Sequence, residues 1–266
     1  MKSQKEIALD NKILSLVSGV AQKTVELLIN DQEIHHLQEY ANIVSIKRLG
    51  YNDHGPVHMR TVCINALTMA DLLNAAGIKL NLEKEEIGTF EDSKVVLLLA
   101  GFMHDIGMSI GRERHEQMAI IMAIPILDRL LSQIYPDDFA KRVTIRSMVV
   151  ECIAGHMATQ HIHSLEAGII LIADGCDMEK GRARIPLLIN TQSKVGDIHK
   201  YSSSSVEHVT IEKGDKRPIK LTVQMSESVG FFQVEEVLFT KINSSTIKPY
   251  IELQAFVTNG PVKHYL

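Results

Sequence analysis

The chain has 266 residues, of which 45% are apolar and 23% charged, and its formal charge is −4. It is long enough for one large domain and a smaller one, and it lacks the basic excess that gives non-specific affinity for nucleic acid. Charges are interspersed near the N-terminus, unlike in a signal peptide, and the longest clean apolar stretch, 95–103, is about half a membrane span. We therefore expect a cytoplasmic protein with no nucleic-acid or membrane partner.

The three cysteines, Cys63, Cys152 and Cys176, are odd in number and show no CxxC spacing. This argues against a disulfide framework and against a thiolate zinc site. We expect buried thiols in a reducing compartment.

Helical spacing of apolar residues dominates from residue 6 to about 191, with breaks at 50–53, at Gly77 and at 135–138. The sequence therefore predicts a helical domain over 1–200. In one of these helices, His58 extends an apolar face that continues at Val62, Ala66 and Met69, so we expect this imidazole to point inward.

A serine-rich stretch at 200–205 is typical of a linker or an exposed loop. Beyond it, alternating segments at 206–212 and 219–225 predict a hairpin, 230–242 a helix and 250–257 a strand. The fold class is thus mainly α, with a small β-β-α-β domain over 206–266. Phe231 and Phe232 begin the predicted helix, and we expect this domain to form a homodimer contact or to have a regulatory role.

Histidines are concentrated in the helical part. Seven of the twelve lie between residues 54 and 163, at positions 54, 58, 104, 115, 156, 161 and 163. A single helical histidine is more often structural than a ligand, but imidazoles and carboxylates that helices turn inward suit divalent transition metals. The apolar segment 95–107 ends in His104-Asp105 before Gly107, a residue expected to break the helix, and a charged pair there needs compensation.

Three segments, NDHGPVHMRTV, LLLAGFMHDIG and IILIADGCDMEKGR, together resemble the HD-domain superfamily of metal-dependent phosphohydrolases over roughly residues 50–185. The resemblance implies metal ligands at His58, His104, Asp105 and Asp174. His54 stands before Gly55-Pro56, and we expect it in a loop as an additional ligand, a substrate contact or a structural residue. Proline favours the first helical turn, which supports His58 as the ligand.

Some members of this superfamily bind two or more ions, and the resemblance implies a second ion held by His115 and His156, with Asp105 as the bridge. His161 is a further candidate for metal or substrate binding, or a solvent-facing residue. The GYP element of the branch that cleaves cyclic di-GMP is missing, so that substrate is not favoured.

Charged residues around these positions suggest further roles. Asp177 lies one turn beyond Asp174 and either orients a ligand or pairs with a nearby lysine or arginine. Three cations are candidates for binding substrate phosphate, with solubilising surface charge as the alternative: Arg112, Lys180 and Arg182.

We expect a phosphohydrolase that cleaves a phosphate ester or anhydride, with a nucleotide as the first-ranked substrate, by means of metal-activated water. The cofactors would be two divalent ions per chain, drawn from Fe, Mn, Co, Ni and Zn. Asp105 would be the catalytic residue that positions the water. Two alternatives are a metal-containing regulatory protein that binds a phosphorylated ligand without turnover, and a helical scaffold with structural histidines.

Overall fold

The computed structural model describes residues 2–179 and 202–266. Helices fill the first range, and the second holds a small four-stranded sheet with a helical crossover, so the predicted fold class is confirmed. The three cysteines are free and buried, as expected.

The three predicted breaks, at 50–53, at Gly77 and at 135–138, each fall between helices. Gly50 and Gly77 both have positive φ, at 69° and 76°. In chain order the helices are α1 (Gln4–Ser15), α2 (Gly19–Asn30), α3 (Gln32–Ile43), the π-helix η1 (Val44–Leu49), α4 (Pro56–Ala75), α5 (Asn81–Lys84), α6 (Phe90–Met103), the 3-10 helix η2 (Ile106–Ser109), α7 (His115–Ile134), α8 (Phe139–Gly155) and α9 (Leu165–Cys176).

Helix α6 lies at the centre of the helical part. Every residue from 92 to 103 is buried, and α2, α4, α8 and α9 pack around the helix. It begins in a capping box, in which Thr89 Oγ1 accepts from the Asp92 amide and the Asp92 carboxylate accepts from the Thr89 amide. Because α6 is apolar on all sides from 95 to 103, it presents polar side chains only at its two ends, and His104-Asp105 follow its C-terminal end.

Helix α7 is long and apolar enough to cross a membrane by length and composition alone. The core helices of soluble proteins pass the same test, so this feature does not decide between the two environments.

The C-terminal unit, residues 202–266, contains a mixed sheet in the order β1-β2-β3-β4. β1 and β2 are antiparallel, as the predicted hairpin requires, whereas β2 and β3 are parallel because helices connect them. β4, which the sequence did not predict, adds a short antiparallel edge. The elements are β1 (Val206–Lys213), β2 (Ile219–Met225), η3 (Ser228–Gly230), the π-helix η4 (Gln233–Leu238), α12 (Phe239–Ser244), η5 (Lys248–Tyr250), β3 (Ile251–Val257) and β4 (Lys263–His264).

The expectation of a linker or an exposed loop at 200–205 is wrong for the part that the structure describes, residues 202–205. Residues 202–205 form a helical turn, and Ser202, Ser203 and Ser205 are buried. Ser202 Oγ accepts from Gln233 Nε2 at 3.0 Å, and the Ser205 carbonyl accepts from the Ser226 amide at 2.8 Å. Hydrogen bonds inside the fold offset the free-energy cost of burying a serine hydroxyl. Composition alone does not reveal such partners.

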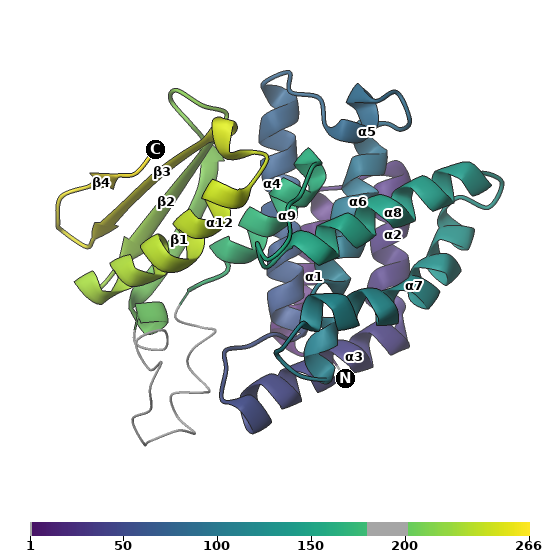
Figure 1. Cartoon of the computed structure of the whole chain (residues 1–266), viewed down its shortest axis with the longest axis horizontal. Coiled ribbons are helices and arrows are strands. Elements are labelled where there is room, and N and C mark those ends of the chain that lie inside the picture. Colours follow the sequence, from purple (N-terminus) through teal and green to yellow (C-terminus); the bar gives the residue numbers. More distant parts are fainter. Residues whose placement is uncertain (1, 180–201) are drawn as a thin grey trace.

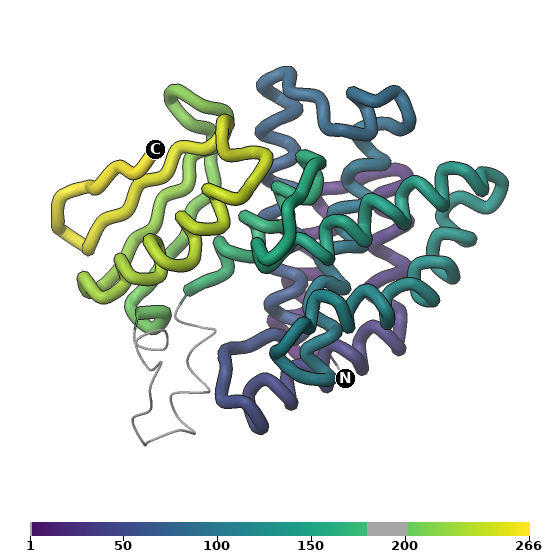
Figure 2. Tube along the Cα trace, in the orientation of Figure 1, coloured from purple at the N-terminus to yellow at the C-terminus, as the bar shows by residue number. Residues whose placement is uncertain are grey.

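The C-terminal unit packs on two helices of the first part. α12 and η4 contact α9, and β1 and β2 contact α4. Figure 1 shows the sheet at one side of the molecule, with α4 and α9 between it and the other helices. The tube in Figure 2 shows the same segments, distant in the sequence, running side by side.

Candidate metal centre

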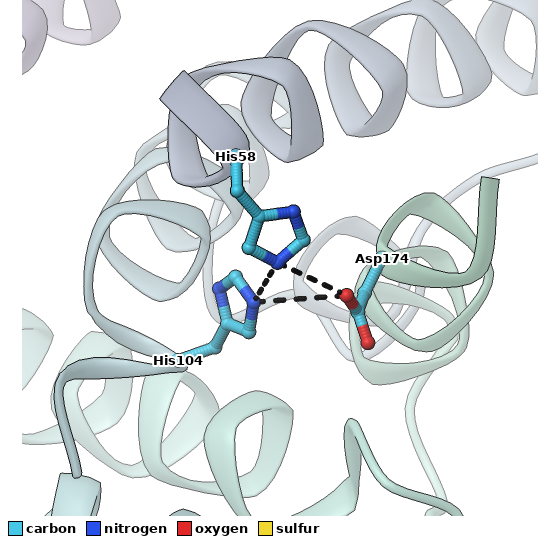
Figure 3. A group of neighbouring side chains, drawn as sticks. All are labelled: His58, His104 and Asp174. Atoms are coloured by element: carbon cyan, nitrogen blue, oxygen red, sulfur yellow. Dashed lines mark hydrogen bonds and ion pairs between the residues drawn. The ribbon is translucent and has the colours of Figure 1, made fainter. Parts of the chain in front are cut away.

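His58, His104 and Asp174 come together from three different helices. His58 lies in the first turn of α4, His104 caps the C-terminus of α6, and Asp174 lies near the end of α9. Figure 3 shows the three side chains pointing toward one another. His58 Nε2 lies 3.1 Å from His104 Nε2 and 3.2 Å from Asp174 Oδ1. We call these residues the first group; their ligand atoms could hold a metal ion.

A second group lies beside the first and consists of Asp105, His115 and His156. Asp105 Oδ1 lies 3.1 Å from His115 Nε2 and 3.4 Å from His156 Nε2, and the two imidazole nitrogens are 3.1 Å apart. Asp105 and His156, together with His104, form another set of atoms able to hold an ion. His115 begins α7 and His156 caps the C-terminus of α8.

Asp105 connects the two groups. Its Oδ1 lies beside the imidazoles of His115 and His156. Its Oδ2 lies 3.2 Å from His58 Nε2 and 3.4 Å from His104 Nε2. One carboxylate therefore presents one oxygen to each group, which is the arrangement a bridging ligand needs.

The Nδ1 atoms of all four histidines contact an oxygen outside the centre. His104, His115 and His156 each use Nδ1 toward the carbonyl three residues upstream, at 3.0, 2.9 and 2.7 Å. His58 Nδ1 lies 2.6 Å from Asp177 Oδ2. Carbonyl and carboxylate oxygens only accept, so each neutral ring carries its proton on Nδ1 and presents the Nε2 lone pair to the centre.

The electrostatics of the centre also favour bound cations. Burial would raise the pKa of Asp105, but the imidazoles of His104, His54 and His115 around it hold its pKa well below the ordinary value, so the carboxylate is ionised. Burial lowers the pKa of His156 to about 4, so this ring is neutral near pH 7. Nε2 lone pairs and carboxylate oxygens thus face one another at about 3 Å, the spacing of neighbouring ligands around an ion about 2.1 Å from each. The residues present fit a metal ion.

Gly107 allows the second group to reach Asp105. The sequence suggested that this glycine breaks α6, but the α-helix ends at Met103 and Gly107 lies within the 3-10 helix η2. A Cβ at position 107 would overlap the carbonyl oxygen of His115 and lie 2.6 Å from the Ala119 amide nitrogen. The missing side chain therefore lets the first turn of α7 approach the loop that carries Asp105.

The remaining candidate residues lie at different distances from this centre. The His54 ring is 5.8 Å from that of His58, and its Nδ1 lies 3.0 Å from Ser45 Oγ and 2.7 Å from the Asn52 carbonyl. His161 is exposed, and its ring contacts that of His163 at 4.9 Å. It belongs to neither group.

Of the three cations expected to bind phosphate, the structure describes Arg112. Its guanidinium lies 6.0 Å from the centre of the Tyr51 ring, and its Nη2 lies 3.9 Å from Met157 Sδ. Lys180 and Arg182 lie outside the described residues.

Lys241 is a residue of the centre that sequence reasoning missed. It lies on α12, pairs with Asp174 Oδ2 and donates to the His156 carbonyl at 2.8 Å. A signal was present, because Lys241 falls on the same helical face as the buried residues Val234 and Leu238. A lysine on an apolar face needs a buried partner.

Comparisons with known proteins give one similarity over nearly the whole chain and two over part of it. The chain is 37% identical over 249 residues to "Uncharacterized protein MJ1020" of Methanocaldococcus jannaschii, covering 94% of each chain. It is 23% identical over 192 residues to "Ribonuclease Y" of Mycoplasma capricolum subsp. capricolum, covering 67% of this chain and 33% of that protein. Ribonuclease Y of Mycoplasma mycoides subsp. mycoides SC matches with the same identity and coverage. No family model and no solved structure matches.

Proposed function

The chain belongs to the family of the Methanocaldococcus jannaschii protein MJ1020, and we propose that it is a metal-dependent phosphohydrolase of the HD-domain superfamily. One observation carries the proposal. Four imidazoles and two carboxylates turn toward one another in a buried centre, and cations held between them would remove the repulsion between their acceptor atoms. The partial similarity to ribonuclease Y supports hydrolysis at phosphorus.

We infer two ions per chain. One would be held by His58, His104, Asp105 and Asp174, and the other by Asp105, His115 and His156. The mixed imidazole and carboxylate ligands suit Mn, Fe, Co, Ni or Zn. When bound, such ions polarise the phosphoryl oxygens and activate water.

The chain's own residues orient these ligands. Asp177 accepts from His58 Nδ1, and backbone carbonyls accept from Nδ1 of the other three histidines, so the rings cannot rotate away. Asp105 is the residue we infer to position the attacking water, because its carboxylate lies between the groups.

Substrate would approach from the Asp174 side of the centre. The Asp174 and Asp177 side chains are 11% exposed, whereas those of His58, His104 and Asp105 are at most 3% exposed. A phosphate group that enters there meets the centre at its accessible edge. We propose a nucleotide or another phosphate ester or anhydride as the substrate, in a cytoplasmic protein that acts as a homodimer.

The test combines metal analysis with a substrate panel. Purified protein, supplied in turn with Mn, Fe, Co, Ni, Zn and Mg, is assayed against nucleoside mono- and triphosphates, cyclic nucleotides, bis(p-nitrophenyl) phosphate and a short RNA. We expect two ions per chain and metal-dependent hydrolysis of at least one substrate. D105N should lose both ions and the activity, whereas D215N, at an exposed carboxylate in the β1–β2 hairpin, should keep them.

Two outcomes would contradict the proposal. Wild-type protein that binds no metal would remove its basis, and full activity in D105N would remove the role of Asp105. Bound metal without turnover on any substrate would favour the regulatory alternative.

A further inference from the structure

Lys241 joins the C-terminal unit to the first group of ligands. Its Nζ pairs with Asp174 Oδ2, while the other carboxylate oxygen, Oδ1, faces His58 Nε2 at 3.2 Å. Asp174 therefore has an inner oxygen directed at the centre and an outer oxygen bound by an ammonium. The same Nζ donates to the His156 carbonyl at 2.8 Å, and the lysine side chain is only 10% exposed.

The docking of α12 on α9 fixes this lysine in place. Gly175 follows Asp174, and a Cβ there would lie 3.0 Å from Lys241 Cδ, so the aliphatic stem of the lysine lies directly against the α9 backbone. Just beyond α12, Ser245 Oγ donates to the Gly168 carbonyl at 3.0 Å, and Thr246 Oγ1 donates to the Ser164 carbonyl at 2.7 Å. These bonds tie the C-terminal unit to the helix that carries Asp174.

Charge supports the same contact. Asp174 and Lys241 carry opposite charges in a buried setting, with side chains only 11% and 10% exposed. A buried ammonium without a partner would be costly, so the pair is held together from both sides.

We propose that Lys241 is a positioning residue, and that the C-terminal unit thereby sets the affinity of the first group for its ion. The hydrogen bond to the outer oxygen holds the Asp174 carboxylate so that the inner oxygen points at the ligands of α4 and α6. Partners of this kind typically change metal affinity about 10- to 100-fold when removed. This inference rests on the proposed function, because the ion concerned is that of the phosphohydrolase.

The experiment uses the full chain and Co²⁺ as the probe. Wild type, K241M and K241Q are titrated with Co²⁺ by calorimetry and by visible absorption, whose bands report the coordination geometry. The matched control is K263M, because Lys263 belongs to the same unit, is 52% exposed and pairs with Glu235. Thermal melting shows whether each variant is folded.

We expect K241M to weaken one of the two Co²⁺ affinities about 10- to 100-fold and to shift the absorption bands of that ion. The second ion should be affected less, because Lys241 reaches the second group only at the backbone carbonyl of His156. K241Q keeps a neutral donor toward Asp174 and should show a smaller loss in the same ion, which also covers the case that K241M does not fold. K263M should match wild type.

Unchanged or tighter binding of both ions in K241M and K241Q would overturn the inference, and so would an equal loss of both. If wild type binds Co²⁺ but hydrolyses nothing, the proposed function fails while the difference between wild type and K241M still tests the inference. If wild type binds no Co²⁺, both are overturned.

Discussion

The two groups of ligands at the metal centre are supported in different ways. In the first group, the side chains of Asp177 and Lys241 hold His58 and Asp174 from outside. In the second group, the backbone carbonyls of Arg112 and Ile153 hold the two imidazoles. In the first group only His104 is held locally, by the Gly101 carbonyl, and His58 and Asp174 depend on distant elements. In the second group both imidazoles are held within one helical turn, and the distant Lys241 reaches only the His156 backbone.

This difference predicts how each group responds to substitution. The first group can be weakened through residues that bind no metal. The second can be weakened only through its ligands or through the backbone that carries them. Asp105, with one oxygen in each group, belongs to both.

The largest effect is expected from removing one imidazole of either group. H58A should lose the first ion, and H115A should lose the second, while each variant keeps the other ion. Several kcal/mol of transition-state stabilisation would be lost in both, so hydrolysis should fall on the order of 10³-fold. Metal content and kcat/KM measure the two effects, and H208A, at an exposed imidazole, is the control. Loss of both ions in each variant would mean that the two groups are one cooperative site.

A substitution at Gly107 tests whether the second group depends on the backbone. In G107A, the added methyl would overlap the His115 carbonyl, so the first turn of α7 must move. Overpacking of this kind costs about 2 to 3 kcal/mol of unfolding free energy. The second ion should also bind more weakly, while the first is little changed. Urea denaturation and metal titration measure these effects, with G111A as control because a Cβ there meets nothing within 4 Å. Wild-type affinity for both ions would contradict the prediction.

Asp177 gives the corresponding test for the first group. D177N keeps the shape of the side chain but removes the charge that His58 Nδ1 faces at 2.6 Å. The imidazole becomes a weaker ligand, and affinity for the first ion should fall about tenfold. A titration in which D177N loses the second ion, or neither ion, would contradict the difference between the groups.

Much of the secondary structure could be predicted because the spacing of apolar residues along the sequence differs between helices and strands. Apolar spacing gave the helices of the first part, and alternation gave the hairpin and the third strand. The same spacing predicts that His58 points inward, and His58 is buried. An apolar helix followed by His104-Asp105 indicates a polar site at the end of that helix. The structure brings these residues together with Asp174, although their roles as metal ligands stay predictions.

The remaining features depend on contacts between distant segments. The carbonyls that hold His104, His115 and His156 belong to ordinary residues and leave no signal in side-chain chemistry. Lys241 escapes sequence reasoning because tertiary contacts, which the sequence does not show, dock α12 on α9. The serine-rich composition of 202–205 predicts exposure, but Ser202 is buried against Gln233, a partner that is distant in the sequence. The composition of a segment does not determine whether its residues are buried, because burial depends on tertiary neighbours.

The smallest effect is expected at the N-terminal end of α6, the helix that His104 caps at its other end. Asp92 is buried and accepts from Tyr135 Oη at 2.6 Å, from Lys141 Nζ at 3.0 Å and from the Thr89 amide at 2.9 Å. Burial raises its pKa, but these hydrogen bonds outweigh burial and leave the pKa below its ordinary value. D92N should therefore lower the unfolding free energy by about 1 kcal/mol at pH 7.

The pH dependence separates this loss from an effect on the metal centre. A carboxylate with a depressed pKa in the folded state contributes its full stability above its ordinary pKa, and the contribution disappears as the pH falls through the folded value. The difference between wild type and D92N in urea denaturation should therefore be constant from pH 6 to pH 8 and shrink below about pH 4. Because the substitution is one helix length away from His104, both ions should keep their affinities. Weaker binding of the second ion in D92N would show that α6 transmits strain to the centre and that local backbone support does not insulate the second group.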